Sequence, residues 1–257
     1  NDMKKVLLIG CNGQTGRVVQ AAIQQHSQLE LDAGIDRHPG ETGAFPIYQE
    51  LTDVQEKIDL VIDFSHHSMP NQVVDYCVSQ QLPVVIATTG LSAEMIARIK
   101  EAGTEIPVFY SANMSLGVNA LIKALQSIAP ILEEDFQIEI IEKHHRNKKD
   151  APSGTALLLA DSINDVLAHK KDYIHGRTGN ENENAMSEIG IHAVRGGSIP
   201  GEHTVIFAGE DELIELKHTA LSRTIFANGA LKAGLFLVDQ PEGFYSMNEL
   251  LSETLVS

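Results

Sequence analysis

The first half of the chain alternates short, continuously apolar runs with segments whose apolar residues recur at a helical period. The apolar runs are rich in β-branched residues and span residues 6–10, 29–36, 59–65, 83–90 and 107–113. Helical spacing between them covers residues 14–25, 70–80 and 92–102. Continuous rather than alternating apolar runs indicate strands that are covered on both faces. This order therefore predicts an α/β domain with a doubly wound parallel sheet of the Rossmann type.

The pattern changes after residue 113. A long helix is expected to follow and to end at the helix breaker Pro130. Strand-like runs then dominate, at residues 136–141, 188–194, 203–208 and 211–218, with one clear helix at 153–167. This half predicts a second, α+β domain with an open mixed sheet. Helical patterns return at 222–238 and 246–255, and the polar stretch 176–187 is expected to be a long mobile loop.

Composition and charge exclude several classes of protein. The chain has 257 residues, of which 43% are hydrophobic, enough to bury a sizeable core. A net charge of −16 argues against nucleic acid and anionic membranes as partners. We find no signal-peptide pattern and no apolar run near the ~18 residues that span a bilayer. Two cysteines without framework or metal spacing suit a reducing compartment, so we expect a cytoplasmic protein without a metal.

A Gly-rich turn joins the first strand to the first helix. Gly10, Gly13 and Gly16 are spaced GxxGxxG rather than the usual GxGxxG, and Cys11 stands where the usual first Gly would be. Glycine lets the backbone approach a ligand closely, and a helix N-terminus offers N–H groups to a pyrophosphate. Asp36 ends the second strand, twenty positions after Gly16, where a carboxylate accepts hydrogen bonds from a ribose. Together these features predict a dinucleotide site.

The alternative is a ligand-free strand-to-helix turn in which Asp36 only caps a loop. The choice of cofactor also stays open at this point. Asp36 favours the free 2′-hydroxyl of NADH, whereas the adjacent Arg37 can pair with the 2′-phosphate of NADPH. Cys11 is interpreted as a small apolar loop filler rather than a reactive thiol.

Positive charge gathers in one segment of this acidic protein, EIIEKHHRNKKDAPSGTA at residues 139–156. A strand gives way there to a loop and then to a helix. His144 and His145 can reach one ligand only if the strand ends at the pair, because successive strand residues point to opposite faces. Ser153 is the expected N-cap, and the N–H groups of residues 154–156 with Lys148 would form a seat for a carboxylate.

Two alternatives compete for this segment. It can be a solvated basic loop before an ordinary capped helix, and residue by residue the two interpretations are evenly matched. A zinc site is the other possibility, but no cysteine lies nearby and no third ligand has the expected spacing.

The same segment closely resembles the signature of the 4-hydroxy-tetrahydrodipicolinate reductase (dihydrodipicolinate reductase) family of bacterial diaminopimelate and lysine synthesis. The resemblance continues through DFS at 63–65, ATTG at 87–90, SANMSLGVN at 111–119, EIGIHAVRGG at 188–197, GEHTVIFAG at 201–209 and FANGALKA at 226–233. It thus covers essentially the whole chain.

The resemblance implies a two-domain, NAD(P)H-dependent oxidoreductase. Residues 1–115, completed by 225–257, would bind the dinucleotide, and residues 116–224 would bind a cyclic dicarboxylate and join the subunits of a homotetramer. His144 is similar to the family's general acid/base and Lys148 to its second proton donor. His145, Lys148, Gly154 and Thr155 would hold the substrate. The matching cofactor positions are Gly10, Cys11, Asn12, Gly13, Gln14, Thr15, Asp36, Arg37, Ala87, Thr88, Thr89, Ser111, Ala112, Asn113 and Met114.

Two rival functions remain alongside the reductase. One is a non-catalytic dinucleotide sensor, and the other is a different small dehydrogenase on the same architecture. A thioester-forming semialdehyde dehydrogenase needs a nucleophilic cysteine in its cleft, and Cys11 and Cys77 are both poorly placed for that. The His-His-x-x-Lys cluster argues against both rivals.

Overall fold

A computed structural model describes residues 3–39, 44–180 and 185–256 of the chain. The chain divides into two compact units. Unit 1 combines Asn1–Leu116 with Arg223–Ser257, and unit 2 is Gly117–Ser222. Each has its own sheet and its own buried apolar core.

Unit 1 is built on a seven-stranded sheet in which every pair of neighbouring strands is parallel. Its order is β12-β6-β5-β4-β1-β2-β3. The strands are β1 (Lys4–Ile9), β2 (Leu29–Ile35), β3 (Ile47–Tyr48), β4 (Leu60–Asp63), β5 (Val84–Ile86), β6 (Pro107–Tyr110) and β12 (Gly243–Tyr245). The chain runs outward in one direction from β1 to β3 and in the other from β4 to β6. The order therefore reverses between β1 and β4, as in a doubly wound Rossmann-type sheet.

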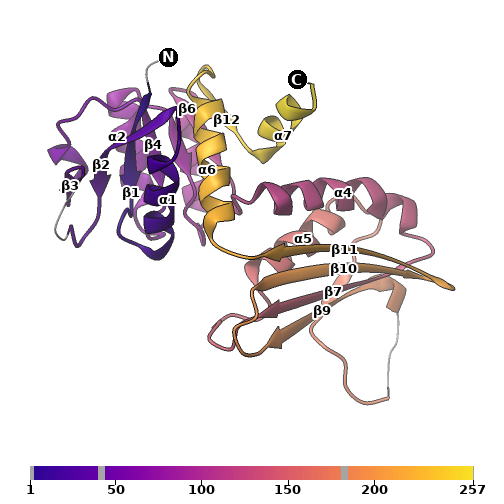
Figure 1. Ribbon diagram of the computed structural model, residues 1–257. Coiled ribbons are helices and arrows are strands. Elements are labelled where there is room, and N and C mark those ends of the chain that lie inside the picture. The colour runs from indigo at the N-terminus through magenta and orange to yellow at the C-terminus, as the bar shows by residue number, and fades with distance from the viewer. Residues whose placement is uncertain (1–2, 40–43, 181–184, 257) are drawn as a thin grey trace. The chain divides into compact units, whose positions relative to one another are not determined.

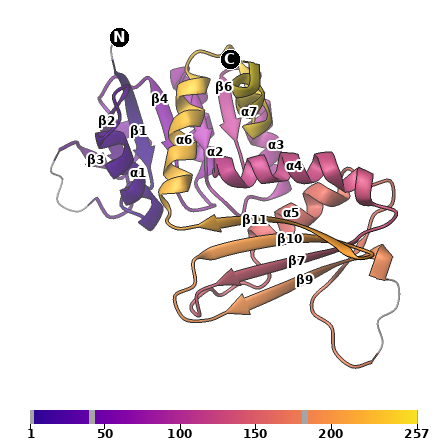
Figure 2. The same ribbon diagram turned by 45° about the vertical axis from the view of Figure 1, so that its right-hand side comes forward.

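Helices cover both faces of this sheet (Figures 1 and 2). One face packs against α1 (Gln14–Gln24), α6 (Thr224–Leu237) and α7 (Met247–Val256). The other packs against α2 (Pro70–Gln80) and α3 (Ala93–Ala102), and a 3-10 turn, η1 (Leu51–Asp53), adds to that side. Because both faces are covered, β4 is completely buried at all four positions, which explains its uninterrupted apolar run.

The predicted strands and helices of unit 1 are confirmed, with ends that shift by one or a few residues. Two short strands, β3 and β12, were not predicted. They span only two and three residues, so they carry no recognisable periodicity. Each exists because a neighbouring strand offers it a free edge for pairing, β2 in one case and β6 in the other.

Unit 2 contains a mixed five-stranded sheet in the order β11-β10-β7-β9-β8. The strands are β7 (Gln137–His144), β8 (Asp172–Ile174), β9 (Glu188–Arg195), β10 (Gly201–Gly209) and β11 (Glu212–Ala220). β10 is antiparallel to β7 and β11, and β9 is parallel to β7 and β8. The helices α4 (Leu116–Leu132) and α5 (Gly154–Asn164) pack on one face. The alternation of buried and less buried residues along β7 and β10 marks that face.

The elements of this half differ from the predicted ones in three places: the end of α4, the end of β7 and the additional strand β8. The helix α4 does not end at Pro130 but continues to Leu132. A proline in the last turn removes a single helical hydrogen bond, so the turn can still close. The three-residue strand β8 was missed, and β7 extends from the predicted 141 to His144. The predicted loop 176–187 lies partly outside the described residues, and a 3-10 turn, η2 (Ala185–Ser187), closes it.

Candidate active site

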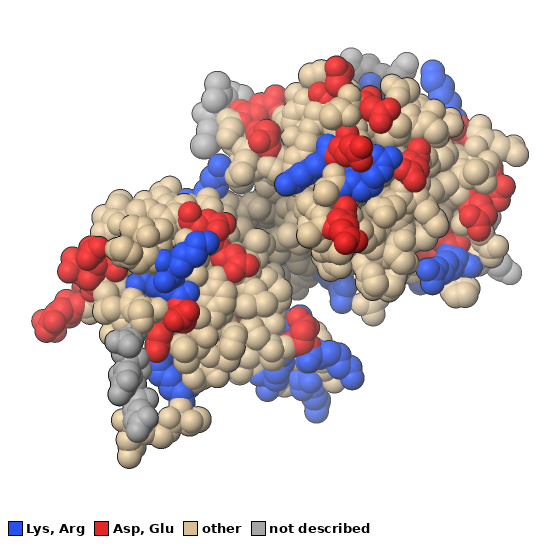
Figure 3. All heavy atoms as spheres, turned by 180° about the vertical axis from the view of Figure 1, so that it is seen from behind, with Lys and Arg blue, Asp and Glu red and all other residues tan. Residues whose placement is uncertain are grey.

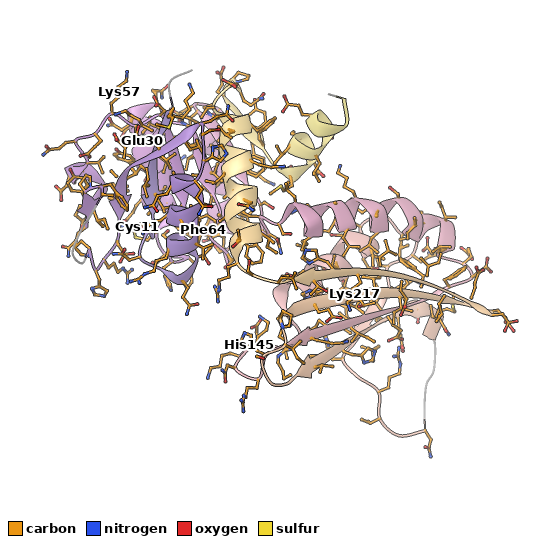
Figure 4. All side chains as sticks on the ribbon, in the orientation of Figure 1. Cys11, Glu30, Lys57, Phe64, His145 and Lys217 are labelled. Carbon is orange, nitrogen blue, oxygen red and sulfur yellow. The ribbon has the colours of Figure 1, made fainter. Side chains whose placement is uncertain are left out.

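The Gly-rich turn at the carboxyl end of β1 is packed tightly against its surroundings. Gly10 has φ +75°, and a β-carbon placed on it would lie 2.6 Å from the carbonyl oxygen of Phe64. A β-carbon on Gly16 would lie 2.0 Å from the carbonyl oxygen of Gly10. Both positions therefore require glycine, and Figure 4 shows Cys11 and Phe64 at the same end of the sheet.

The helix after this turn begins without a cap. Gly13 is its N-cap residue, no side chain caps it, and its first turn holds no acidic residue. An uncapped helix start leaves backbone N–H groups and the positive end of the helix dipole for an anion. Gln14 and Thr15 form the first turn, and the Thr15 hydroxyl accepts a hydrogen bond from Arg223 at 3.4 Å. The turn thus has the donor set that a pyrophosphate requires.

Cys11 is an interior residue of this turn rather than a reactive one. Its side chain is completely buried. Desolvation by burial, reinforced by the charge of Asp36, raises the pKa of the Cys11 thiol to about 11. A protonated thiol is a poor nucleophile, and a β-carbon on Gly34 would lie 2.7 Å from its sulfur. The interpretation of Cys11 as a loop filler agrees with this packing.

Asp36 lies directly after β2 and ties two loops together. Its Oδ2 accepts from the Asn12 N–H at 3.1 Å, and its Oδ1 accepts from the His38 N–H at 3.0 Å. The Asn12 side chain donates to the His38 carbonyl at 2.8 Å. Arg37, next to Asp36, is exposed. The predicted ribose acceptor and the Gly-rich turn therefore meet at one edge of the sheet.

The other predicted cofactor positions follow β5 and β6 at the same edge. Ala87 and Thr88 are buried and Thr89 is exposed. After β6, the hydroxyl of Ser111 donates to the Asn113 carbonyl at 2.6 Å, Ala112 is exposed, and Met114 is buried. Ligands in doubly wound sheets bind at the carboxyl ends of the strands, next to the reversal of strand order. The structure brings all of these positions to that edge of unit 1.

A buried carboxylate that the sequence analysis did not single out lies at the end of β4. Asp63 is completely buried, and its Oδ1 accepts from the Ser65 N–H at 2.8 Å. Its Oδ2 and the Thr88 hydroxyl have no hydrogen-bond partner in the described part of the chain. Desolvation by burial outweighs the opposing effect of Ser65 and of the nearby Thr88 hydroxyl, and raises the pKa of Asp63 to about 6.

The His pair of unit 2 lies at the carboxyl end of β7, where Figure 4 labels His145. The strand ends at His144, so His145 already belongs to the following turn and is exposed. The Lys148 N–H donates to the His145 carbonyl at 3.1 Å. Because β7 ends at this pair, His144 and His145 are not held on opposite faces of a strand, and both rings can reach one ligand.

The segment after the pair leads into α5. Ser153 is the N-cap, as predicted, and its hydroxyl accepts from the Ala156 N–H at 3.1 Å. The expected seat formed by the N–H groups of residues 154–156 is therefore wrong in one respect, because Ala156 is already bonded. Gly154 is exposed, has an ordinary φ, and a β-carbon on it would meet nothing within 4 Å. Packing does not require glycine there, so a side chain at this position would extend into space that the described protein atoms leave open.

Lys148 carries its charge beside this helix start. Its ammonium lies 2.8 Å from Asp150 Oδ1, and the side chain of Asp150 is 59% exposed. Such an exposed ion pair contributes little to stability and exchanges readily with solvent. A ligand carboxylate can therefore compete with Asp150 for Lys148.

Three further findings concern surface charge, membrane-spanning helices and metal ligands. In Figure 3, Lys and Arg side chains lie among Asp and Glu rather than forming one broad basic face. No helix within the described ranges combines the length and the apolarity needed to cross a membrane. The same ranges contain no group of three or more His, Cys, Asp or Glu placed to hold a metal ion.

Comparison with known proteins decides the family. The model of the dihydrodipicolinate reductase N-terminus matches residues 4–114, and that of the C-terminus matches residues 117–251. The chain is 49% identical over 251 residues to the 4-hydroxy-tetrahydrodipicolinate reductase of Caldanaerobacter subterraneus subsp. tengcongensis, covering 98% of this chain and 99% of the relative.

This chain belongs to the dihydrodipicolinate reductase family. The Clostridium tetani member is 46% identical over 250 residues, with 97% and 98% of the two chains covered. A dipicolinate-bound dihydrodipicolinate reductase from Paenisporosarcina sp. TG-14 has the same fold, with a TM-score of 0.80 and 23% identity over 95% of this chain and 97% of that one. As a member of the family the chain is an NAD(P)H-dependent oxidoreductase.

The structure also shows a cluster of polar and charged side chains around His144 that the sequence analysis missed. Glu142, two residues earlier on β7, is completely buried, and its Oε2 lies 2.6 Å from His144 Nδ1. Arg195 of β9 donates to both of its oxygens at 2.7 Å. His203 of β10 lies 2.6 Å from the Ser153 hydroxyl and edge-to-face to His144. The i, i+2 spacing of Glu142 and His144 was the one signal available, because such residues share a strand face.

Burial sets the charge of this cluster. Desolvation acts to raise the pKa of Glu142, but hydrogen bonds from Arg195, His144 and the Ser153 N–H outweigh it and hold that pKa below its ordinary value. Desolvation, followed by the charge of His144, lowers the pKa of His203 to about 4. At neutral pH the cluster thus contains an ionised Glu142, a charged Arg195 and a neutral His203.

Proposed function

We propose that this chain reduces 4-hydroxy-tetrahydrodipicolinate to tetrahydrodipicolinate, with loss of water, in the diaminopimelate and lysine pathway. The observation that carries the proposal is the position of His144 at the end of β7, next to the Ser153-capped start of α5 and to Lys148. In a chain of this family, that arrangement combines a proton donor with groups that bind carboxylates. Residues 1–115 with 225–257 would bind the dinucleotide, and residues 116–224 the substrate.

The residues at the strand ends of unit 1 fit a nicotinamide dinucleotide. The uncapped start of α1 would hold the pyrophosphate, and Asp36 would accept from a ribose hydroxyl. The turns at 87–89 and 111–114 would line the nicotinamide side. When bound, the cofactor supplies a hydride to the substrate.

The substrate class is a cyclic imine with two carboxylates. His145, Lys148, Gly154 and Thr155 would hold those carboxylates, with Lys148 moving from Asp150 onto the substrate. Loss of the hydroxyl as water gives a ring in which a C=C bond is conjugated with the imine. Addition of hydride to the ring carbon at the far end of that C=C bond moves negative charge onto the ring nitrogen, so a proton must reach that atom. His144 or Lys148 would provide it, directly or through water.

The nucleotide preference rests on Asp36 and its neighbours. The carboxylate of Asp36 suits the free 2′-hydroxyl of NADH, and the exposed Arg37 suits the phosphate of NADPH. Gln14, the first residue of α1, is uncharged and adds no positive charge for that phosphate. We therefore propose that both NADH and NADPH serve, without a strong preference for NADPH.

We also propose that the protein is a cytoplasmic homotetramer. A homotetramer would form through the face of the unit 2 sheet opposite α4 and α5, which presents Leu213 at 64% exposure and Val194 at 42%. Exposed apolar residues on one face favour contact with another subunit. The two buried free cysteines suit the cytoplasm, and we propose neither nucleic acid nor membrane as a partner.

A coupled assay tests the reaction. Pyruvate and aspartate semialdehyde with the preceding synthase generate the unstable substrate, and oxidation of NADH and NADPH is followed separately. We expect turnover with both nucleotides. Absence of oxidation by a folded protein that still binds dinucleotide would overturn the proposal and favour the sensor.

His144→Ala tests the proton donor in the same assay. It should lower kcat by roughly 10²–10⁴-fold with little change in cofactor affinity. The control is His169→Ala, which removes an exposed histidine of unit 2. An unchanged kcat in His144→Ala would exclude His144 as the donor.

A further inference from the structure

The carboxylate of Glu142 is bound on all sides by donors from three separate elements. Arg195 Nη1 reaches Oε2 and Nη2 reaches Oε1, each at 2.7 Å, in a two-pronged contact from β9. The Ser153 N–H at the start of α5 donates to Oε1 at 3.0 Å. His144 Nδ1 lies 2.6 Å from Oε2. A fully buried carboxylate with a paired guanidinium and satisfied lone pairs is fixed in place.

This contact determines which nitrogen of His144 carries a permanent proton. An ionised carboxylate only accepts hydrogen bonds, so Nδ1 must hold a hydrogen and donate it to Glu142. The proton that His144 gives or takes is then the one on Nε2. A β-carbon placed on Gly201 of β10 would lie 3.2 Å from that Nε2, so the absence of a side chain there keeps its surroundings open.

Glu142 also fixes the two segments proposed to bind the substrate. Through the Ser153 N–H it positions the first turn of α5. Through Arg195, whose Nη2 donates to the Asp150 carbonyl at 2.7 Å, it positions the loop that carries Lys148. One buried carboxylate therefore connects the proton donor with both carboxylate-binding segments.

We propose that Glu142, held by Arg195, is a positioning residue of the reductase: it fixes His144 with its proton on Nδ1 and supports the imidazolium form that donates from Nε2. This inference rests on the proposed role of His144. It adds a residue that makes no contact with the reacting atoms and acts through the histidine. The arrangement corresponds physically to a carboxylate that orients a catalytic imidazole.

Charged and titratable groups from several elements surround the His144 ring. They are Glu142 on the same strand, Arg195 opposite it on β9, His203 at 5.1 Å between ring centroids on β10, and Lys148 in the following loop. Among the described residues, Glu142 is the negative charge in contact with the ring. Its replacement by Gln leaves the ring beside positive and neutral groups.

The test compares Glu142→Gln with Glu139→Gln. Glu139 lies on the opposite face of the same strand and makes a matching set of contacts, with His192 Nε2 at 2.5 Å and Arg177 Nη1 at 2.8 Å. We expect Glu142→Gln to lower kcat at pH 7.5 by roughly 10²–10³-fold and to change the shape of the pH profile of kcat, because the ring loses its charged partner. Glu139→Gln, checked for unchanged assembly by light scattering, should keep the wild-type profile.

A second measurement covers the case in which Glu142→Gln does not fold, since it leaves Arg195 buried without its partner. The ¹⁵N resonances of the His144 ring, assigned by their loss in His144→Gln, report the tautomer of the wild-type enzyme. Protonation at Nδ1 is expected, and a neutral ring protonated at Nε2 would overturn the inference. A low kcat in His144→Ala with an unchanged profile in Glu142→Gln would refute the role of Glu142 alone. A wild-type kcat in His144→Ala would refute the donor itself.

Discussion

Replacement of Asp63 by Asn should stabilise unit 1 at neutral pH. Asp63 is completely buried at the end of β4, and only its Oδ1 has a partner, the Ser65 N–H. An ionised carboxylate without a cation in such a place opposes folding. The Asn side chain keeps an acceptor for Ser65 and puts a neutral amide beside the Thr88 hydroxyl, which can accept from it.

The size of the stabilisation expected for Asp63→Asn follows from the pKa of Asp63, which burial raises from 3.8 to about 6 in the folded protein. The unfolded chain loses its proton near 3.8, so between that value and 6 the folded state holds more protons than the unfolded state. The contribution of Asp63 to the free energy of unfolding is therefore fully present below pH 3.8 and is lost as the pH rises through 6. A pKa raised from 3.8 to about 6 corresponds to a loss of about 3 kcal/mol in the free energy of unfolding at pH 7 and above.

The assay is thermal and urea unfolding of wild type and Asp63→Asn from pH 4 to pH 8 at one protein concentration. The variant should match the wild type near pH 4 and exceed it by about 3 kcal/mol at pH 8, which is roughly 6–10 °C in Tm. The control is Asp75→Asn on α2, whose side chain is 63% exposed and paired with Arg98. A stability difference between Asp63→Asn and wild type that stays constant with pH would refute the reasoning.

Three further substitutions test the two proposed binding sites. Asp36→Ala should weaken NADH binding more than NADPH binding, because only NADH offers a free 2′-hydroxyl; equal losses in fluorescence titrations would place the ribose contact elsewhere. Lys148→Ala should raise KM and lower kcat in the coupled assay, and an unchanged KM would remove Lys148 from the carboxylate site. Gly154→Ala should fold normally, with at most about 1 kcal/mol of added stability, yet raise KM, because the new methyl meets no protein atom but covers the helix start. Gly229→Ala is its counterpart: a β-carbon there would lie 1.6 Å from the Met114 carbonyl oxygen, so circular dichroism and expression should report a loss of folded protein.

The sequence by itself determined the features that depend on neighbouring residues. Continuous apolar runs predicted the buried strands, and helical spacing predicted the covering helices of unit 1. The Gly-rich turn and Asp36 predicted the strand-end site, since such a turn needs residues without a β-carbon. The Ser153 cap before α5 was also visible, because a capping bond joins residues three apart.

Only the tertiary structure decided which distant residues share the sites. Arg195 reaches Glu142 because β9 pairs with β7 in a register that sets it opposite His144, fifty-one positions away in the chain. His203 meets Ser153 across a similar separation. The burial of Asp63, and with it the raised pKa, requires helices on both faces of the sheet. Short strands such as β12 exist only because another strand offers an edge. Local patterns fix the elements, whereas strand register and the packing of helices determine which buried charges meet.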